Sequence, residues 1–384
     1  MKIALVHDYL TQKGGAERVF ELLCSYFPQA DIFTSVYSRD NTIDLGDRPV
    51  NTTALQYLPG ATQYFRLFAP LYYPLFRTLD LTDYDLVISS TSSFAKGVQT
   101  NPQAKHICFC HNVTRFLWDT KTYLHQYSNY KKYSFLIEKI FAQMRKVDVK
   151  YASEPDLYIA NSTTVSKRIK QYYGRDSVMI NYPIDSSKFY YSDHKDDFYL
   201  VACRLFGYKK VSVIIEAFNQ LQLPLSIIGD GPERAKLESQ AKDNIKFLGY
   251  VSDHRRQELM AKARTVVVAA LEDYGLVPVE ANASGTPVVS YGAGGVLDTQ
   301  VSGKTGIFFN SQTAEELKQA ILKAEKINWN SSQIRHHALS NFSEIVFFSK
   351  VTKVIECACG YSIVDFVEPK LWEQVRNINQ VNLN

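Results

Sequence analysis

The stretch Phe198–Leu221, FYLVACRLFGYKKVSVIIEAFNQL, decides the fold class. It opens with a short apolar run, Tyr199–Ala202, which is typical of a strand buried on both faces of a parallel sheet. A polar and basic loop follows, and Val211–Leu221 then shows the apolar spacing of a helix packed along one face. A strand, a loop and a helix in this order are the repeating unit of parallel α/β architecture.

The same alternation continues on both sides of this stretch, so we expect two doubly wound, Rossmann-like α/β domains. Before the middle of the chain, strands are expected at 3–6, 86–89, 106–109 and 157–160, with helices at 17–27 and 162–173. After it, strands are expected at 199–202, 225–228, 245–247, 266–269 and 287–290, with helices at 211–221, 233–242, 255–263 and from 279.

The length of the chain, 384 residues, is suited to two domains with separate cores. A polar stretch at 181–197, which contains Pro183 and several charges, is the expected boundary. We therefore predict a first domain at 1–185, a second at 186–350, and a tail at 351–384 that packs back towards the first.

Composition excludes several classes of protein. Apolar residues make up 46% and charged residues 21%, which argues against a disordered or fibrous chain. A net charge of +4 is too small to indicate a nucleic-acid partner. The N-terminus lacks a signal-peptide pattern and no apolar run approaches the ~18 residues of a spanning helix. We expect a cytoplasmic protein, or one on the cytosolic face of a membrane.

Two segments of the first domain combine aromatic and basic residues. Tyr57–Arg77 carries seven aromatics and no acid, and Arg115–Lys150 is rich in lysine, arginine and aromatics. Such segments are suited to an anionic membrane surface. They are equally well explained as aromatic core with a solvated basic face, and the sequence leaves both interpretations open.

Three loops carry candidate chemistry. Lys13–Ala16, with Gly14 and Gly15, follows a strand and opens a helix, so its backbone N–H groups can face an anion, although a plain tight turn explains it too. In the loop after 199–202, Arg204 and Lys209 can clamp a diphosphate or simply be solvated cations. Arg204 and Lys209 follow the carboxyl end of an expected strand, which is where ligands bind in doubly wound sheets.

The third loop, EDYGLVPVE at 272–280, follows the expected strand 266–269 and runs into a helix. Its two carboxylates, Glu272 and Glu280, can lie beside a sugar and a ribose, while the amides of Gly275, Leu276 and Val277 can face phosphate at the start of the helix. A surface acid and an acid that favours the helix dipole are the simpler alternative.

With these blocks in order, the sequence resembles the retaining glycosyltransferases of family 4. RLFGYKK at 204–210 is similar to that family's R-L-x-x-x-K-G, LSIIGDGPERAKLE and NIKFLGYVSD to its next two blocks, and EDYGLVPVEANASGTPVVSYGAGGVLDT to its Glu-x7-Glu region. VHDYLTQKGGAERV, SSTSSFAKGVQT and HICFCHNVTRFLWD resemble a bacterial branch of polysaccharide and O-antigen mannosyltransferases. Lys210 stands where that family usually has glycine, so its turn is expected to differ slightly.

The resemblance implies a GT-B architecture, two Rossmann-like domains facing a cleft, with the donor on the second domain and the acceptor on the first. It implies catalytic roles for His111, Glu272, Arg204 and Lys209, and places Lys96 and Arg115 on the acceptor side. The donor-binding residues it implies are Gly14, Gly15, Arg204, Lys209, Tyr250, Val251, Glu272, Tyr274, Gly275, Leu276, Val277 and Glu280.

The expected function is transfer of a hexose, mannose or another, from a GDP- or UDP-linked donor to a glycan or lipid-linked acceptor in cell-surface polysaccharide synthesis. Retention of configuration is implied by the resemblance alone. No metal and no cofactor are expected, because Arg204 and Lys209 can replace a divalent ion at the leaving diphosphate. Two alternatives stay open: a nucleotide-sugar epimerase on the same architecture, and a two-domain sugar-binding protein without catalysis.

Overall fold

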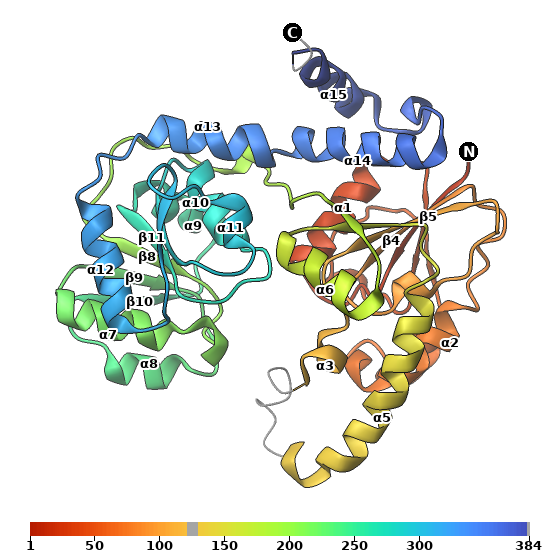
Figure 1. The fold of residues 1–384 in the computed structure, drawn as a ribbon, viewed down its shortest axis with the longest axis horizontal. Coiled ribbons are helices and arrows are strands. Elements are labelled where there is room, and N and C mark those ends of the chain that lie inside the picture. The colour runs from red at the N-terminus through yellow and green to blue at the C-terminus, as the bar shows by residue number, and fades with distance from the viewer. Residues whose placement is uncertain (121–129, 382–384) are drawn as a thin grey trace. The chain divides into compact units, whose positions relative to one another are not determined.

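The computed structural model describes residues 1–120 and 130–381, and the chain forms two compact units (Figure 1). Unit 1 consists of Met1–Asn181 and Phe348–Asn384, and unit 2 of Tyr182–Phe347. The final segment of the chain thus belongs to the same unit as the N-terminus.

Unit 1 is built on a seven-stranded sheet in which every neighbouring pair is parallel, in the order β3-β2-β1-β4-β5-β6-β7. The chain runs outward from β1 to β3 and then resumes on the other side of β1 with β4, which makes β1 and β4 the topological switch point. The strands are β1 (Ile3–His7), β2 (Asp31–Thr34), β3 (Val50–Thr52), β4 (Leu86–Thr91), β5 (Lys105–Cys110), β6 (Leu157–Ala160) and β7 (Ser177–Met179).

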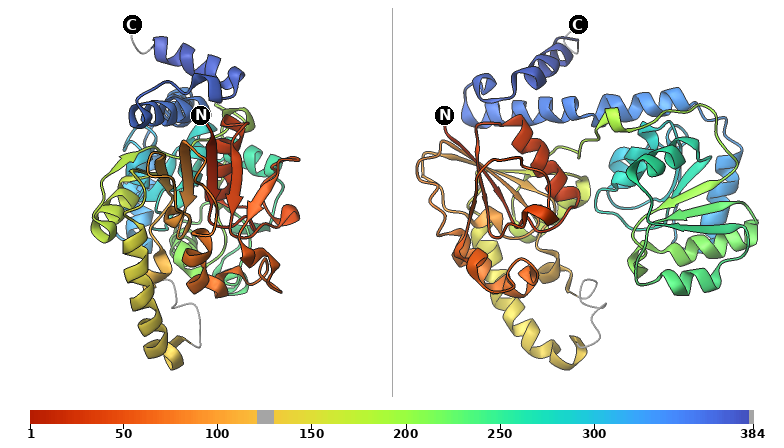
Figure 2. Two further views of the ribbon diagram at one scale, coloured as in Figure 1. Left: turned by 90° about the vertical axis from the view of Figure 1, so that its right-hand side faces the viewer. Right: turned by 180° about the vertical axis from the view of Figure 1, so that it is seen from behind.

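Helices cover both faces of this sheet (Figures 1 and 2). The stacked rings of Tyr26 and Phe348, 4.3 Å apart, join the end of α1 to α14 within unit 1. The helices are α1 (Gly15–Tyr26), α2 (Tyr72–Phe76), α3 (Arg115–Trp118), α5 (Tyr130–Tyr151), α6 (Thr163–Tyr173), α14 (Glu344–Cys359), which crosses the boundary between the units, and α15 (Pro369–Val381). Short 3-10 turns are η1 (Arg39–Asn41), η2 (Ala54–Tyr57), η3 (Phe65–Leu71), η4 (Ala95–Gly97) and η7 (Val364–Phe366).

Unit 2 repeats the design with six parallel strands in the order β10-β9-β8-β11-β12-β13, and its switch point lies between β8 and β11. Its strands are β8 (Tyr199–Ala202), β9 (Leu225–Ile228), β10 (Ile245–Gly249), β11 (Thr265–Val268), β12 (Val288–Tyr291) and β13 (Gly306–Phe309). Its helices are α7 (Val211–Leu221), α8 (Arg234–Gln240), α9 (Asp253–Lys262), α10 (Leu276–Ala283), α11 (Val296–Thr299), α12 (Ala314–Glu325) and α13 (Ser331–Phe342), with the turns η5 (Ser186–Lys188) and η6 (Gly207–Lys209).

Alternate side chains of β8 enter two different cores, which explains its unbroken apolar run. Tyr199 and Val201 pack with α7 and α12 on one face of the sheet. Leu200 and Ala202 pack with α9 and α10 on the other. The prediction of two doubly wound, Rossmann-like units is therefore confirmed.

The aromatic segment Tyr57–Arg77 is divided between the core and the surface. Phe65, Tyr72, Tyr73 and Phe76 are buried in unit 1. The exposed large side chains here are Tyr57, Leu58, Tyr64, Leu67 and Leu71. Of the basic stretch Arg115–Lys150, residues 121–129 lie outside the described residues. The helices within 1–120 and 130–381 include none that is both long and apolar enough to cross a bilayer.

Candidate functional site

The predicted diphosphate clamp lies at the switch point of unit 2. Arg204 and Lys209 follow β8, and Glu272 follows β11, which pairs directly with β8. The Nζ atom of Lys209 donates to Oε1 of Glu272 at 2.5 Å, and both side chains are partly exposed, 16% and 25%. The structure thus brings together two residues that the sequence assigned to separate loops.

Arg204 is exposed beside this pair, in a loop with two aromatic side chains. Its guanidinium lies 5.7 Å from the ring of Phe206, and that ring stacks with Tyr208 at 6.0 Å. The ammonium of Lys209 lies 5.2 Å from the ring of Tyr208. Aromatic faces hold both cations by cation–π attraction while leaving their N–H groups able to bind an anion.

Lys210 adopts the left-handed conformation, with φ 56° and ψ 31°. This region favours glycine, because the Cβ of any other residue is crowded there. Lys210 thus occupies a backbone conformation that favours the glycine expected at this position. The conformation ends η6 and starts α7, which sets the position of Lys209.

The Glu272 loop is held by a close approach of two backbones. The N–H of Gly295 donates to the carbonyl oxygen of Glu272 at 2.9 Å, and Gly294 forms a bridge with the same residue. A Cβ on Gly294 would lie only 2.2 Å from that oxygen, so this position admits glycine alone. Gly275, with φ 88°, then begins α10. Leu276 and Val277 occupy the first turn of α10 and are half-buried.

Glu280 is buried on α10, and its carboxylate accepts a hydrogen bond from Arg256 at 2.6 Å. Arg256 lies on α9, and no sequence motif drew attention to it. Burial opposes the charge of Arg256, but the carboxylate of Glu280 outweighs this and raises the pKa of the guanidinium. The contact with Arg256 fixes the orientation of the Glu280 carboxylate.

Three other residues predicted to bind the donor, Tyr250, Val251 and Tyr274, differ in how far they are exposed to solvent. Tyr250 follows β10 and is 86% exposed, and the neighbouring Val251 is half-buried. Tyr274, in contrast, is buried, and its hydroxyl donates to the carbonyl oxygen of Tyr182 at 2.9 Å. Tyr274 anchors the first residue of unit 2, so its side chain does not face solvent.

In unit 1, the predicted residue His111 follows β5 and is buried near the switch point of β1 and β4. Its Nε2 lies 2.7 Å from the hydroxyl of Ser90, at the end of β4. Burial disfavours the charged ring, and a nearby histidine, His7, adds to this, so the pKa of His111 falls to about 3. A neutral imidazole at physiological pH is able to form hydrogen bonds to a sugar.

Gly14 and Gly15 lie at the start of α1, as expected for an anion-facing turn. The carboxylate of Glu17, however, lies against this turn, since a Cβ on Gly14 would be 2.6 Å from its Oε2. Burial opposes the charge of Glu17, but its interactions with His7 and Gln12 outweigh burial and lower its pKa. A phosphate that approached here would meet this negative charge.

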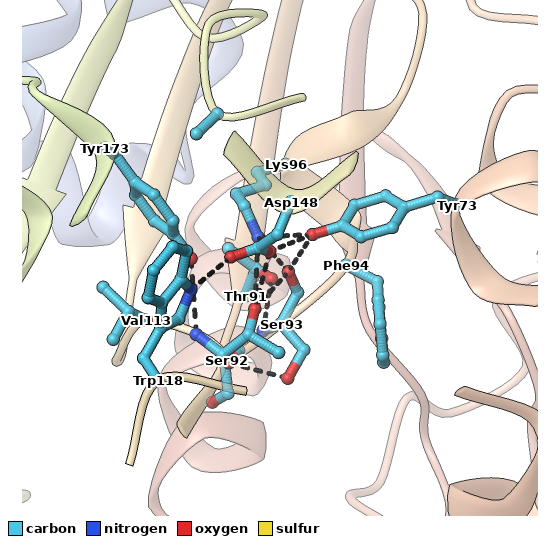
Figure 3. Close-up of polar contacts among 12 residues, drawn as sticks. Tyr73, Thr91, Ser92, Ser93, Phe94, Lys96, Val113, Trp118, Asp148 and Tyr173 are labelled. Carbon is cyan, nitrogen blue, oxygen red and sulfur yellow. Dashed lines mark hydrogen bonds and ion pairs between the residues drawn. The ribbon is translucent and has the colours of Figure 1, made fainter. Parts of the chain in front are cut away.

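Lys96, expected on the acceptor side, is in the core of unit 1 and only 1% exposed (Figure 3). Its Nζ lies 2.7 Å from Oδ1 of Asp148, a residue of α5 that is fully buried. Burial raises the pKa of Asp148, but Lys96 and the donors around it outweigh burial and lower it. The carboxylate also accepts hydrogen bonds from Tyr73, Thr114 and Trp118.

This closed network corrects the expectation for Lys96: its ammonium joins η4 to α2 and α5 and is not presented to a ligand. Arg115, the second residue expected there, lies at the start of α3 and is 39% exposed, 3.5 Å from Asp119. Within residues 1–120 and 130–381, no group of three or more His, Cys, Asp or Glu is arranged to hold a metal ion.

Two family models match successive parts of the chain. Residues 13–188 match the family model described as Glycosyltransferase Family 4, and residues 185–341 match Glycosyl transferases group 1. The two matches together support a group 1/family 4 glycosyltransferase.

Curated relatives agree with these matches at low identity. The chain is 28% identical over 157 residues to an uncharacterized glycosyltransferase of Methanocaldococcus jannaschii, with 40% of this chain and 43% of that protein covered. It is 26% identical over 176 residues to O-antigen chain mannosyltransferase C of Escherichia coli, with 42% and 45% covered. These alignments span less than half the length of the relatives.

Among solved structures, HepE of Anabaena in complex with UDP has a TM-score of 0.68 at 20% identity, with 93% of this chain and 100% of that chain covered. Sucrose-phosphate synthase of Thermosynechococcus elongatus has a TM-score of 0.69 at 16% identity, with 93% and 99% covered. At these identities the similarity establishes the fold alone, and it confirms the predicted GT-B class.

Proposed function

We propose that this chain transfers a hexose, with mannose as the first candidate, from a nucleoside-diphosphate sugar to a glycan or lipid-linked acceptor. The contact between Lys209 and Glu272, with Arg204 on the same loop, is the observation that carries the proposal. It puts two cations and a carboxylate where doubly wound sheets bind ligands. The mannosyltransferase relative and the UDP-bound structural neighbour support this choice of donor class.

The ion pair suggests how the donor is accepted. Without donor, Glu272 neutralises Lys209. A diphosphate carries more charge than one carboxylate and competes for the ammonium, so Lys209 changes partner when the donor binds. Glu272 is then released to accept hydrogen bonds from sugar hydroxyls. One residue pair thereby couples recognition of the phosphate to recognition of the sugar.

The same cations serve the chemical step. Cleavage of the sugar–phosphate bond develops negative charge on the leaving diphosphate and positive charge on the ring. Arg204 and Lys209 stabilise the negative charge that develops on the diphosphate. Because this charge is larger in the transition state than in the ground state, their contacts raise turnover, and the proposal requires no divalent ion. Retention of configuration belongs to the proposal through the family resemblance.

Glu280 is proposed to bind the ribose of the donor. Arg256 holds its carboxylate at 2.6 Å, and carboxylate oxygens are the acceptors that ribose hydroxyl groups need. A ribose contact persists from the ground state to the transition state, so Glu280→Gln is expected to raise KM more than it lowers kcat. Glu272→Gln is expected to lower kcat more than it raises KM. Equal effects of both variants on both constants would remove these separate roles.

We also propose that unit 1 holds the acceptor and associates with an anionic membrane. A lipid-linked acceptor lies in the membrane, so an enzyme that uses it has to bind there. The exposed Tyr57, Tyr64 and Leu67 supply apolar contact, and the exposed Arg66 lies among them. Sedimentation with anionic liposomes at low salt is expected. Failure to sediment under these conditions excludes the membrane part of the proposal.

The function is tested by incubating the protein with GDP- and UDP-sugars, with and without lipid-linked acceptors, in the presence of EDTA. The expected result is a glycosylated acceptor that retains the anomeric configuration of the donor. An epimerised nucleotide sugar without transfer would select the epimerase instead. Binding that raises the melting temperature without any turnover would select a sugar-binding protein.

A further inference from the structure

Four buried side chains of unit 1 form a continuous polar chain that leads from α1 to His111. Oε1 of Glu17 lies 3.9 Å from Nε2 of His7. Nδ1 of His7 lies 3.0 Å from the hydroxyl of Ser90, and that hydroxyl lies 2.7 Å from Nε2 of His111. All four are at most 5% exposed; His7 ends β1, Ser90 is the last residue but one of β4, and His111 follows β5.

The chemistry of these groups restricts where the protons lie. A serine hydroxyl has one proton to donate, and here it stands between two imidazole nitrogens. If the hydroxyl donates to His7, it can only accept from His111. The protonation of one ring therefore determines the protonation of the other.

Glu17 selects between the possible arrangements. Its pKa is lowered against the effect of burial, so it is a carboxylate at neutral pH. It is also fixed in place, because Gln12 donates to its Oε1 at 2.9 Å. A negative charge 3.9 Å from Nε2 of His7 favours a proton on that nitrogen, which leaves Nδ1 of His7 as an acceptor for Ser90.

We propose that Glu17, His7 and Ser90 are positioning residues that hold His111 as its Nε2–H tautomer, with the lone pair on Nδ1. Ring contacts keep the geometry: the ring of Phe20 lies 4.8 Å from that of His7, and the ring of Phe109 5.3 Å from that of His111. A role for this tautomer in sugar transfer rests on the proposed function, whereas the tautomer itself does not.

The chain offers a matched control one residue away. The hydroxyl of Ser89 lies 2.8 Å from Nε2 of His106, so it forms a second buried serine–histidine pair. Ser89 and Ser90 are successive residues of β4 and point to opposite faces of the sheet. Ser89→Ala therefore removes the same kind of hydrogen bond without touching the chain that leads to His111.

The experiment measures the tautomer of His111 by 1H–15N correlation in the full chain with ring-labelled histidine, assigned with His111→Gln. An Nε2–H tautomer is expected in wild type and in Ser89→Ala, and a mixture of tautomers in Ser90→Ala and Glu17→Gln. In a transfer assay, Ser90→Ala is expected to lower kcat about tenfold with little change in KM, and Ser89→Ala to leave both unchanged.

An Nδ1–H tautomer in wild type, or an unchanged His111 spectrum in Ser90→Ala, overturns the proposal. So does an equal loss of kcat in the two serine variants. Because the spectrum needs no donor or acceptor, it decides the positioning role even if no sugar transfer is found, and failure of the proposed function is thus seen separately.

Discussion

The two units share one architecture but hold their charges in different ways. In unit 1, Lys96 and Asp148 form an ion pair enclosed by protein, 1% and 0% exposed. In unit 2, Lys209 and Glu272 form a pair that water can reach. A buried charge cannot leave its partner without a large desolvation penalty, whereas a partly exposed charge can exchange partners at a smaller cost. The pair in unit 1 is thus suited to rigid positioning, whereas the pair in unit 2 can exchange its carboxylate for another anion.

The largest expected effect comes from breaking the enclosed pair. Lys96→Met leaves the carboxylate of Asp148 buried without its cation, and we expect a loss of about 3–5 kcal/mol in the free energy of unfolding. Urea denaturation measures this. The double variant Lys96→Met/Asp148→Leu removes both charges and is expected to lose less. A single variant as stable as wild type would show that the enclosed pair does not hold unit 1 together.

The exposed pair is expected to matter for turnover and not for stability. Lys209→Ala removes a preorganised donor to the developing diphosphate charge, so turnover should fall about 10²–10³-fold. Arg204→Ala is expected to be at least as severe, because its guanidinium can hold two oxygens at once. The neighbouring exposed Lys210→Ala serves as a control. Near-normal turnover in both clamp variants, or loss of wild-type activity in EDTA, would point to a metal ion in place of the clamp.

Acid should destabilise unit 1 through its buried histidines. Burial lowers the pKa of His106 to about 4 and that of His111 to about 3. Between the unfolded value near 6.5 and these folded values, the unfolded chain binds protons that the folded chain does not, so stability falls as pH falls. Each histidine contributes about 1.4 kcal/mol per pH unit in this window.

Urea titrations at pH 7 and pH 5 test whether the free energy of unfolding decreases as the pH falls. The free energy of unfolding is expected to be lower at pH 5 than at pH 7. In His106→Gln this decrease should be about 2 kcal/mol smaller than in wild type, because one of the two histidines is absent. The carboxylates of Asp148 and Glu17 have lowered pKa values and lose their contribution only at lower pH. An identical loss in wild type and variant would contradict the effect of burial.

The smallest effect concerns the left-handed turn of unit 2. Lys210→Gly relieves the crowded Cβ at φ 56° and is expected to stabilise the protein by about 1 kcal/mol, with turnover retained. Thermal unfolding and the transfer assay measure the two quantities. Destabilisation by glycine would mean that the lysine side chain contributes more to this turn than its backbone conformation costs.

The sequence predicted the central strands well because they are buried on both faces, and β8 and β9 have the bounds expected for them. Of the four edge strands, β10 was predicted and β3, β7 and β13 were missed, and the interior strand β2 was missed as well. β3 and β7 are three residues long and partly exposed, so they lack an apolar run. α5 was noted only for its charges and aromatics, because its helical spacing is masked by exposed Phe135 and Ile140.

The candidate site was predicted in part. Lys209 and Glu272 were found because each follows a strand at the switch point. Lys96 was misplaced because a lysine in a polar loop normally lies at the surface, and its partner Asp148 is 52 residues away in the sequence. Arg256 was missed because its partner Glu280 lies on another helix, 24 residues away in the sequence. His7 at the end of β1 and Ser90 near the end of β4 were the available signal for the chain leading to His111, since polar residues are unusual in buried strands.

The central claim is that Lys209 exchanges Glu272 for the diphosphate of the donor. Calorimetric titration of wild type, Glu272→Gln and Lys209→Ala with UDP and with GDP, in EDTA, tests it most directly. Because Glu272→Gln removes the competing carboxylate, this variant should bind the preferred nucleotide about threefold more tightly than wild type while its transfer rate falls. Lys209→Ala should bind more weakly. Weaker or unchanged binding in Glu272→Gln would contradict the exchange of partners.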